Sequence, residues 1–209
     1  TDDTENYGVV LPGESKEVQD GYYFHVSSNI SDGTSIEFEM TSTDDTASWI
    51  SNFSIIAHAP NLTMSNCQVV DPTGNNNGRL DPGETADLDI TLINYGSSDA
   101  YNVTGDLISI SPYVSVVSDF KNYGDLQSGA SGSQVFAVNV DPNAPEGQTA
   151  PFMMEVTADR GLAQVITFDL VIGKTPVLVI DMDGNLNSGQ SLVDAASSLG
   201  LIADYMQSV

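Results

Sequence analysis

Apolar and polar residues alternate along most of this chain, as expected for β-strands with one buried face. The alternation is clearest over 86–94, where Ala86, Leu88, Ile90 and Leu92 are separated by polar residues. The same pattern predicts further strands at 22–26, 35–40, 49–56, 113–117, 134–140, 152–157 and 163–172. Gly, Pro, Asn and Asp clusters separate these segments, and no helical period occurs before residue 188. The sequence therefore predicts a mostly β fold, built as an immunoglobulin-like β-sandwich.

Two stretches of the chain, 6–60 and 122–176, match each other in order. The matched segments and residues are 6–8 with 122–124, 13–15 with 129–131, 29–34 with 143–148, Phe38 with Phe152, Phe53 with Phe168, and Pro60 with Pro176. A period of about 115 residues is too long for a solenoid and fits tandem sandwich domains. We therefore expect 61–173 to be one complete repeat and 1–60 to be the C-terminal half of a first repeat. The earlier strands of that first repeat are expected upstream of Thr1.

The pattern changes after residue 173. Residues 177–181 form a continuous apolar run, as in a strand buried on both faces of a parallel sheet. We predict a loop over 184–189 and a helix over 191–199 that ends at Gly200. This helix places Leu192, Val193, Ala196 and Leu199 on one face. A second strand is expected over 201–206. Residues 174–209 are thus predicted to open an α/β domain, of flavodoxin-like type, with one βαβ unit.

The chain is strongly acidic. Five Lys and Arg residues face 29 Asp and Glu residues, so the formal net charge is −24. Such a surface repels phosphate backbones and anionic lipids, and this excludes nucleic-acid binding. The sequence contains no run of 18 apolar residues, so membrane insertion is not expected. Cys67 is the single cysteine; no intrachain disulfide can form, and its acidic surroundings predict a raised thiol pKa and no catalytic role.

The segment 71–84 is rich in oxygen-bearing side chains and glycines, which is typical of a calcium-binding loop. When Gly78 is aligned with the invariant glycine of such loops, the spacing of the ligand positions fits except at position 1, which falls on Thr73. Asp71 is the expected substitute for that ligand. The predicted calcium ligands are the side chains of Asp71, Asn75, Asn77, Asp81 and Glu84 and the backbone carbonyl of Arg79. A solvated turn without a metal is the alternative, because these residue types favour turns for backbone reasons alone.

The loop and the segments that follow it resemble a known type of repeat. After 71–84 come Leu-Asp-Ile-Thr-Leu-Ile-Asn-Tyr-Gly at 88–96, Ser-Pro-Tyr-Val-Ser-Val at 111–116 and Asn-Ala-Pro-Glu-Gly at 143–147. Together they resemble the immunoglobulin-like repeats of large secreted bacterial proteins, which often accompany extracellular peptidases, including gingipain-type cysteine peptidases and subtilisin-like enzymes. The resemblance covers 6–173 and implies a stalk or accessory module in which calcium stiffens a loop. Residues 177–189 look like the start of an α/β domain found after such repeats.

Other candidate sites are weaker. Asp181 and Asp183 follow an apolar strand, as in phosphatases of the haloacid-dehalogenase type, but the sequence after them leaves no room for that family's other motifs. A second cation site at these two residues stays open. His25 and His58 are expected to be ordinary strand or surface residues. The aromatic residues that could form a carbohydrate platform, but are expected to be sheet residues, are Trp49, Tyr22, Tyr23 and Tyr113.

These observations predict a non-catalytic, calcium-stabilised spacer or accessory module of a large secreted or cell-surface bacterial protein. Two alternatives remain: part of an extracellular peptidase whose catalytic residues lie outside this chain, and an adhesin module that binds carbohydrate or protein. The expected partners are neighbouring domains of the same protein. Strand pairing with another chain is also expected, because the first half-repeat and the βαβ unit are both incomplete.

Overall fold

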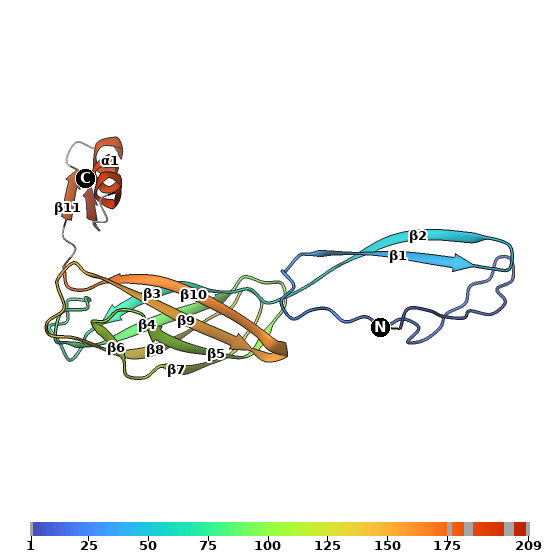
Figure 1. The fold of residues 1–209 in the computed structure, drawn as a ribbon, viewed down its shortest axis with the longest axis horizontal. Helices are drawn as coiled ribbons and strands as arrows, with labels where there is room; N and C mark the ends of the chain where they lie inside the picture. The colour runs from blue at the N-terminus through green and yellow to red at the C-terminus, as the bar shows by residue number, and fades with distance from the viewer. Residues whose placement is uncertain (1, 175–176, 182–185, 199–202, 208–209) are drawn as a thin grey trace.

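A two-sheet β-sandwich occupies the middle of the chain (Figure 1). The structure is a computed structural model, described for residues 2–174, 177–181, 186–198 and 203–207. The first sheet has the order β3 (Leu62–Val70), β4 (Thr85–Asn94), β8 (Ser131–Val140) and β6 (Val114–Val116). The second has the order β10 (Leu162–Val171), β9 (Thr149–Ala158), β5 (Ala100–Ser109) and β7 (Phe120–Leu126). All neighbouring strands in both sheets are antiparallel, which confirms the predicted mostly β, immunoglobulin-like sandwich.

Alternate residues of each sheet fill the space between the sheets. On β4, Leu88, Ile90 and Leu92 are fully buried, while the intervening positions are half-buried. On β9, Phe152 and Met154 are likewise fully buried and belong to the same core. The period-2 alternation read from the sequence is therefore the division between the core face and the outer face of each sheet.

Strand β5 was not predicted, although it lies in the interior of its sheet. Its inward residues include Val103 and Leu107, but its pairing with β7 shifts register between Ala100 and Val103 and again before Thr104. Asn102, at the irregular part of the strand, has a positive φ of 53°. Such a bulge moves one residue out of phase, so the sequence loses the regular alternation that marks a strand.

A separate hairpin, β1 (Ser35–Thr43) and β2 (Ser48–Ile56), lies N-terminal to the sandwich (Figure 1). Both strands were predicted. The strand predicted at 22–26 is wrong: Tyr23 makes only an isolated bridge with Asp2, and residues 2–30 run as an irregular segment beside the hairpin. The equivalent strand of the sandwich, β8, is held between β4 and β6. Residues 22–26 have no such neighbours among the described residues, and a strand without a ladder partner leaves its backbone groups unpaired.

The C-terminal unit consists of β11 (Val177–Asp181), α1 (Leu186–Ser198) and β12 (Ala203–Gln207). The two strands pair in parallel, as the predicted βαβ unit requires. The predicted loop over 184–189 is wrong from Leu186 onward, because the helix already begins there. Gly200 lies outside the described residues. Within the described part of the chain, no helix is both long and apolar enough to cross a membrane.

Candidate functional site

The loop 71–84, between β3 and β4, is tied to both sheets at one end of the sandwich. Leu80 is completely buried and forms a parallel bridge with Ile172, directly after β10. Its carbonyl accepts a hydrogen bond from the Gly173 amide at 2.7 Å. The Glu84 carbonyl accepts one from the Val140 amide at 2.9 Å, at the end of β8. The loop thus joins the end of a strand in one sheet to the end of a strand in the other, beside the point where the chain leaves the sandwich.

Asp71 organises the first half of the loop. Its side chain is buried, and its two carboxylate oxygens accept hydrogen bonds from the amides of Gly78 (2.9 Å) and Asn77 (3.0 Å). The hydrogen bond from the Gly78 amide is the main cause that lowers the pKa of Asp71 below its usual value. Gly78 itself has a positive φ of 74°, which glycine adopts without strain. Asp71 therefore holds the turn around Gly78 as an anionic hydrogen-bond acceptor.

The other predicted ligands gather around Asp81. One oxygen of its carboxylate accepts hydrogen bonds from the side-chain amides of Asn75 and Asn77, both at 2.6 Å. Glu84 accepts a hydrogen bond from the Asn75 backbone amide at 3.1 Å through Oε1. Its second oxygen, Oε2, is shielded from solvent and has no hydrogen-bond partner. A buried carboxylate oxygen without a partner is costly, so a further donor or a cation is expected to satisfy it.

Gly74 makes room for the Glu84 carboxylate. A Cβ atom at Gly74 would lie 2.7 Å from both Cδ and Oε1 of Glu84. The amide of Gly74 also donates to the Asp71 carbonyl at 3.0 Å, which closes the first turn of the loop. A side chain at position 74 would therefore displace the Glu84 carboxylate from its place beside the Asn75 amide.

The structure brings five of the six predicted residues into one hydrogen-bonded network. Asp71 is linked to Asn77, and both asparagines are linked to Asp81, while Glu84 is linked to Asn75. The side chain of Arg79 is half-buried, and its carbonyl is involved in no hydrogen bond within this network. Among the described residues, no three Asp, Glu, His or Cys side chains converge on one point as a ready-made metal site. The reason is that Asp71 turns its oxygens to backbone amides, so asparagines separate it from Asp81 and Glu84.

Of the remaining chemical candidates, those that the structure describes form no assembled site. Burial raises the pKa of Cys67 to about 11, and the nearby Asp89 carboxylate adds to the shift, so the prediction of an unreactive thiol is supported. His25 is exposed and lies outside any strand. Asp183 lies outside the described residues, and of Asp181 only the backbone is described. The prediction of a second cation site there is therefore untested.

A second cluster, which was not predicted, joins the sandwich to the segment that precedes it. Asp32 accepts hydrogen bonds from the amide of Ala59 (2.9 Å) and from the amide (3.1 Å) and hydroxyl of Ser97. His58 Nδ1 lies 2.6 Å from the same hydroxyl oxygen. The hydrogen bond from the Ser97 hydroxyl is the main cause that lowers the pKa of Asp32. Two clefts of about 420 and 510 Å³, each lined by both polar and apolar residues, flank this contact.

Asn94 supports this junction from inside the sandwich. It is fully buried, and its side-chain oxygen accepts hydrogen bonds from the amides of Asn61 and Gly96, both at 3.0 Å. Its side-chain nitrogen donates to the carbonyls of Ser98 (2.9 Å) and Leu126 (3.0 Å). All four hydrogen bonds available to the amide are made, which offsets the cost of burying it.

Gly96 permits the close approach of the linker. A Cβ atom at this position would lie 2.2 Å from the Ala59 carbonyl oxygen and 2.5 Å from the Asn61 nitrogen. Backbone atoms cannot yield to such a contact, so only glycine fits. The Asn-x-Gly sequence at the end of β4 therefore fixes where the incoming chain meets the sandwich. The sequence contains this signal, but its meaning depends on the long-range contact with residues 59–61.

The Asp32, His58 and Ser97 cluster is not arranged as a hydrolase triad. In such triads the carboxylate orients the imidazole, and the imidazole accepts the serine proton. Here the Asp32 carboxylate accepts a hydrogen bond directly from the Ser97 hydroxyl. His58 Nδ1 lies within hydrogen-bond distance of the same Ser97 hydroxyl oxygen. The serine proton is thus already committed to the carboxylate. This geometry suits a structural clasp between two segments of the chain.

No protein-family description matches the sequence, and no curated protein matches it. Among solved structures, the chain is similar to the CARDB domain of a Pyrococcus furiosus protein, crystallised in complex with di-metal ions, with 15% identity and a TM-score of 0.34 over 54% of this chain and 88% of that one. It is also similar to a protein of unknown function from Porphyromonas gingivalis, with 17% identity and a TM-score of 0.36 over 60% of this chain and 59% of that one. At these TM-scores neither likeness indicates what the chain binds.

Proposed function

We propose that this chain is a non-catalytic spacer module of a large secreted or cell-surface bacterial protein, and that calcium bound to the loop 71–84 stabilises it. Its task is to hold neighbouring domains at a defined distance and orientation. The strongly acidic composition, the single cysteine and the oxygen-rich loop support an extracellular setting, where calcium is abundant. The residues 6–60 and 122–176 are two copies of one repeat, of which the second belongs to a complete sandwich.

The observation that carries the calcium proposal is the buried, unpartnered Oε2 of Glu84. It lies in a network whose other members, Asp81, Asn75 and Asn77, are also oxygen-bearing side chains. The two asparagine amides each present nitrogen to Asp81, and a half-turn about the last side-chain bond exchanges nitrogen for oxygen. Carboxylate and amide oxygens are the donors that calcium prefers. Glu84 and Asp81 would hold the cation with Asn75, Asn77 and the Arg79 carbonyl, while Asp71 keeps the turn in place.

The position of the loop explains why a spacer would use calcium here. The loop is bonded to the end of β8 through Glu84 and to residue 173 through Leu80. Gly173 is where the chain leaves the sandwich toward the C-terminal unit. Stiffening the loop therefore stiffens the exit of the chain, just as the Asp32 and Asn94 contacts fix its entry. Each end of the module would then transmit a defined orientation to its neighbour.

Thermal unfolding tests this proposal. The melting temperature in millimolar calcium should exceed that in excess chelator, because a ligand bound only to the folded state adds about 2.7 kcal/mol at a hundredfold excess over its dissociation constant. A Glu84→Ala variant should lose this response, whereas a Glu155→Ala variant, which removes an exposed carboxylate on β9, should keep it. An identical melting temperature of the wild-type chain in both solutions would contradict calcium binding.

A further inference from the structure

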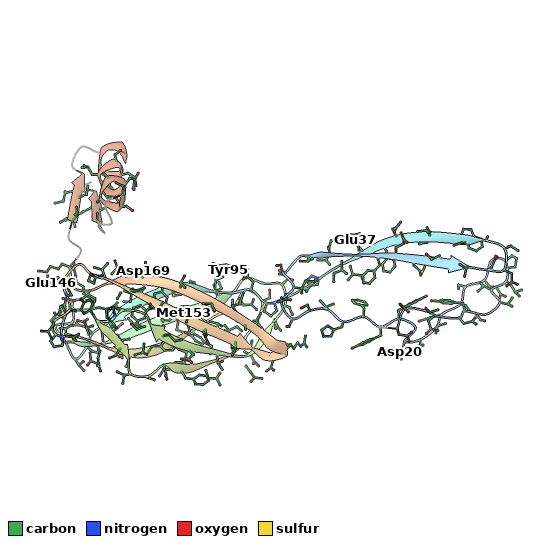
Figure 2. All side chains as sticks on the ribbon, viewed as in Figure 1. Asp20, Glu37, Tyr95, Glu146, Met153 and Asp169 are labelled. Carbon is green, nitrogen blue, oxygen red and sulfur yellow. The ribbon has the colours of Figure 1, made fainter. Side chains whose placement is uncertain are left out.

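The hairpin β1–β2 has one apolar and one polar face. Phe38 pairs with Phe53, and Ile36 with Ile55, so these four residues lie on the same side of the hairpin. Trp49 shares that side, because it is an even number of residues from Phe53. The opposite side is mostly polar and carries Glu37 (labelled in Figure 2), Glu39, Thr41 and Asn52, together with Ile50 and Ile56. The apolar face therefore has the pattern of a sheet that packs against another sheet.

On β2 this apolar face is open to solvent, whereas Ile36 and Phe38 on β1 are half-buried. Phe53 is 48% exposed, Ile55 44% and Trp49 54%. Phe24, from the irregular N-terminal segment, makes an edge-to-face contact with Phe38 at a centroid distance of 5.0 Å, but it is itself 42% exposed. One aromatic side chain does not cover the face. Exposed apolar surfaces of this kind mark sites of protein association.

The sandwich contains the same hairpin in a covered state. Phe38 and Phe53 stack with a centroid distance of 5.2 Å and an interplanar angle of 10°, and Phe152 and Phe168, on β9 and β10, stack with the same two values. Both pairs are directly opposite each other in the strand register. Phe152, however, is completely buried, whereas its counterpart Phe38 is half-buried. Phe168 is half-buried, whereas its counterpart Phe53 is exposed. The two hairpins thus share their internal geometry and differ in what covers them.

Hydrogen bonds at the open ends of the two hairpins, between the residues before the first strand and after the second, show the same correspondence. In the sandwich, Gly147 donates to the Ile172 carbonyl at 2.7 Å, and Ile172 donates to the Gln148 carbonyl at 2.9 Å. In the N-terminal unit, Gly33 donates to the Ala57 carbonyl at 2.9 Å, and Ala57 donates to the Thr34 carbonyl at 2.8 Å. Gly33 and Gly147 both have positive φ, 75° and 79°. The correspondence therefore extends beyond the strands to the loops that enter and leave them.

In the sandwich, the hairpin β9–β10 is covered by the opposite sheet, in which β3 and β4 supply a large part of the core. The core residues from these two strands and the loop between them are Leu62, Leu80, Ala86, Leu88, Ile90 and Leu92. Strand β4 also pairs along its whole length with β8, the counterpart of the segment that contains residues 22–26. Phe24, His25 and Val26 form no main-chain hydrogen bond with any described residue. A strand equivalent to β4 would pair with this segment and cover the apolar face at the same time.

We propose that the apolar face of β1–β2, together with residues 22–26, is a docking surface for an antiparallel strand pair of the β3–β4 type. The partner has aliphatic residues at alternate positions on its inner side and polar or acidic residues outside, as β4 has with Asp87 and Asp89. It adds by β-strand pairing along 22–26 and completes a second sandwich. This inference rests on the proposed tandem-repeat function, because it treats residues 1–60 as part of a repeat.

The single tryptophan makes the docking measurable. Trp49 lies on the apolar face, and a synthetic peptide of residues 61–94 contains no tryptophan. Titration of the full chain with this peptide should shift the Trp49 emission to shorter wavelength in a saturable way. A control peptide in which Leu88, Ile90 and Leu92 are replaced by Ser should give no shift. In the chain itself, Phe53→Ser should abolish the shift, whereas Ile50→Ser, on the opposite face of β2, should leave it intact.

Each other outcome overturns the proposal. If neither peptide shifts the emission, and a copy of residues 61–94 fused ahead of Thr1 by a flexible linker also leaves it unchanged, the face does not bind such strands. Equal shifts with both peptides would mean unspecific adsorption. A shift that grows with protein concentration in the absence of peptide, together with a dimer mass by light scattering, would make a second copy of this chain the occupant. None of these outcomes depends on the melting response to calcium, which tests the spacer loop separately.

Discussion

The β1–β2 hairpin and the β9–β10 hairpin of the sandwich have similar internal geometry but different neighbours. Their phenylalanine pairs stack with equal distances and angles. Phe152 is nevertheless completely buried, whereas its counterpart Phe38 is half-buried. Phe168 is half-buried, whereas its counterpart Phe53 is 48% exposed. Strand register and ring stacking are the same in both hairpins, because both depend on contacts between the two paired strands. Burial requires a second sheet, and with it most of the hydrophobic stabilisation.

The presence or absence of neighbouring strands also explains why β8 is a strand and residues 22–26 are not. Both segments alternate apolar and polar residues, but only β8 has partners on both sides. Tyr23 makes a single isolated bridge with Asp2. Alternation thus predicts which residues could form a strand, and the availability of a neighbour decides whether they do.

The largest expected contrast is between truncations of the two phenylalanine pairs. Phe152→Ala should lower the free energy of unfolding of the sandwich by about 3–5 kcal/mol, since it leaves a cavity in a packed core. Phe38→Ala, in the separate hairpin, should lower the free energy of unfolding of the chain by about 1 kcal/mol or less, because no second sheet packs on the Phe38 ring. Urea denaturation followed by circular dichroism measures both. Similar losses for the two variants would mean that the hairpin face is buried in solution.

Asn94→Ala should have the next largest effect. It leaves the amides of Asn61 and Gly96 and two carbonyls without partners inside the sandwich, which should cost about 1–3 kcal/mol. The matched control is Asn52→Ala on the exposed hairpin, with an expected change within about 0.5 kcal/mol. Urea midpoints compare the two variants. An unchanged midpoint for Asn94→Ala would show that water replaces the amide at no cost.

The pH dependence of stability should identify Asp71 as a charged structural residue. Its pKa is lowered in the folded state, so its contribution is complete above the usual aspartate value of 3.8 and is lost as the pH falls through the lowered folded value. The difference in urea midpoint between wild type and Asp71→Asn should therefore be largest near neutral pH and should shrink in acid. A difference that stays constant between neutral and acidic pH would assign the effect to packing instead of charge.

The smallest effect on stability, but a clear one on geometry, is expected for Asp32→Ala. The substitution removes the acceptor that holds Ala59 and Ser97 together, so the N-terminal unit should sample more orientations while the sandwich keeps its unfolding midpoint. Small-angle X-ray scattering should show a broader distribution of dimensions. Asp45→Ala, in the tip of the hairpin, is the control and should leave the scattering unchanged. Unchanged scattering for Asp32→Ala would show that the linker alone fixes the orientation.

The sequence was sufficient for local features. Alternation predicted seven of the strands to within a few residues, and the apolar run at 177–181 predicted a parallel strand. These predictions succeeded because side-chain period and strand geometry are linked residue by residue. Alternation did not predict β5, where a bulge at Asn102 interrupts the period, or β7, and it wrongly predicted a strand over 22–26. The helix α1 starts at Leu186, before its apolar face is visible in the sequence.

The candidate site divides in the same way. The residue types and spacing of 71–84 already indicate an oxygen-rich loop, and the structure connects Asp71, Asn75, Asn77, Asp81 and Glu84. That Asp71 serves the backbone, and that Glu84 keeps a buried free oxygen, depends on how the loop folds over Gly74. The clasp of Asp32, His58 and Ser97 joins residues far apart in the chain, and no local pattern announces it.

Side-chain chemistry and short-range geometry already indicate which residues can face a core, where the chain turns and which loop is rich in oxygen donors. Three other features follow from the folded arrangement: which of two similar hairpins is more deeply buried, which alternating segment becomes a strand, and which polar groups meet at the junction. Those outcomes depend on contacts between segments that are distant in the chain. Among the described residues, β9–β10 has a partner sheet and β1–β2 has none, and neither hairpin's own sequence shows this difference.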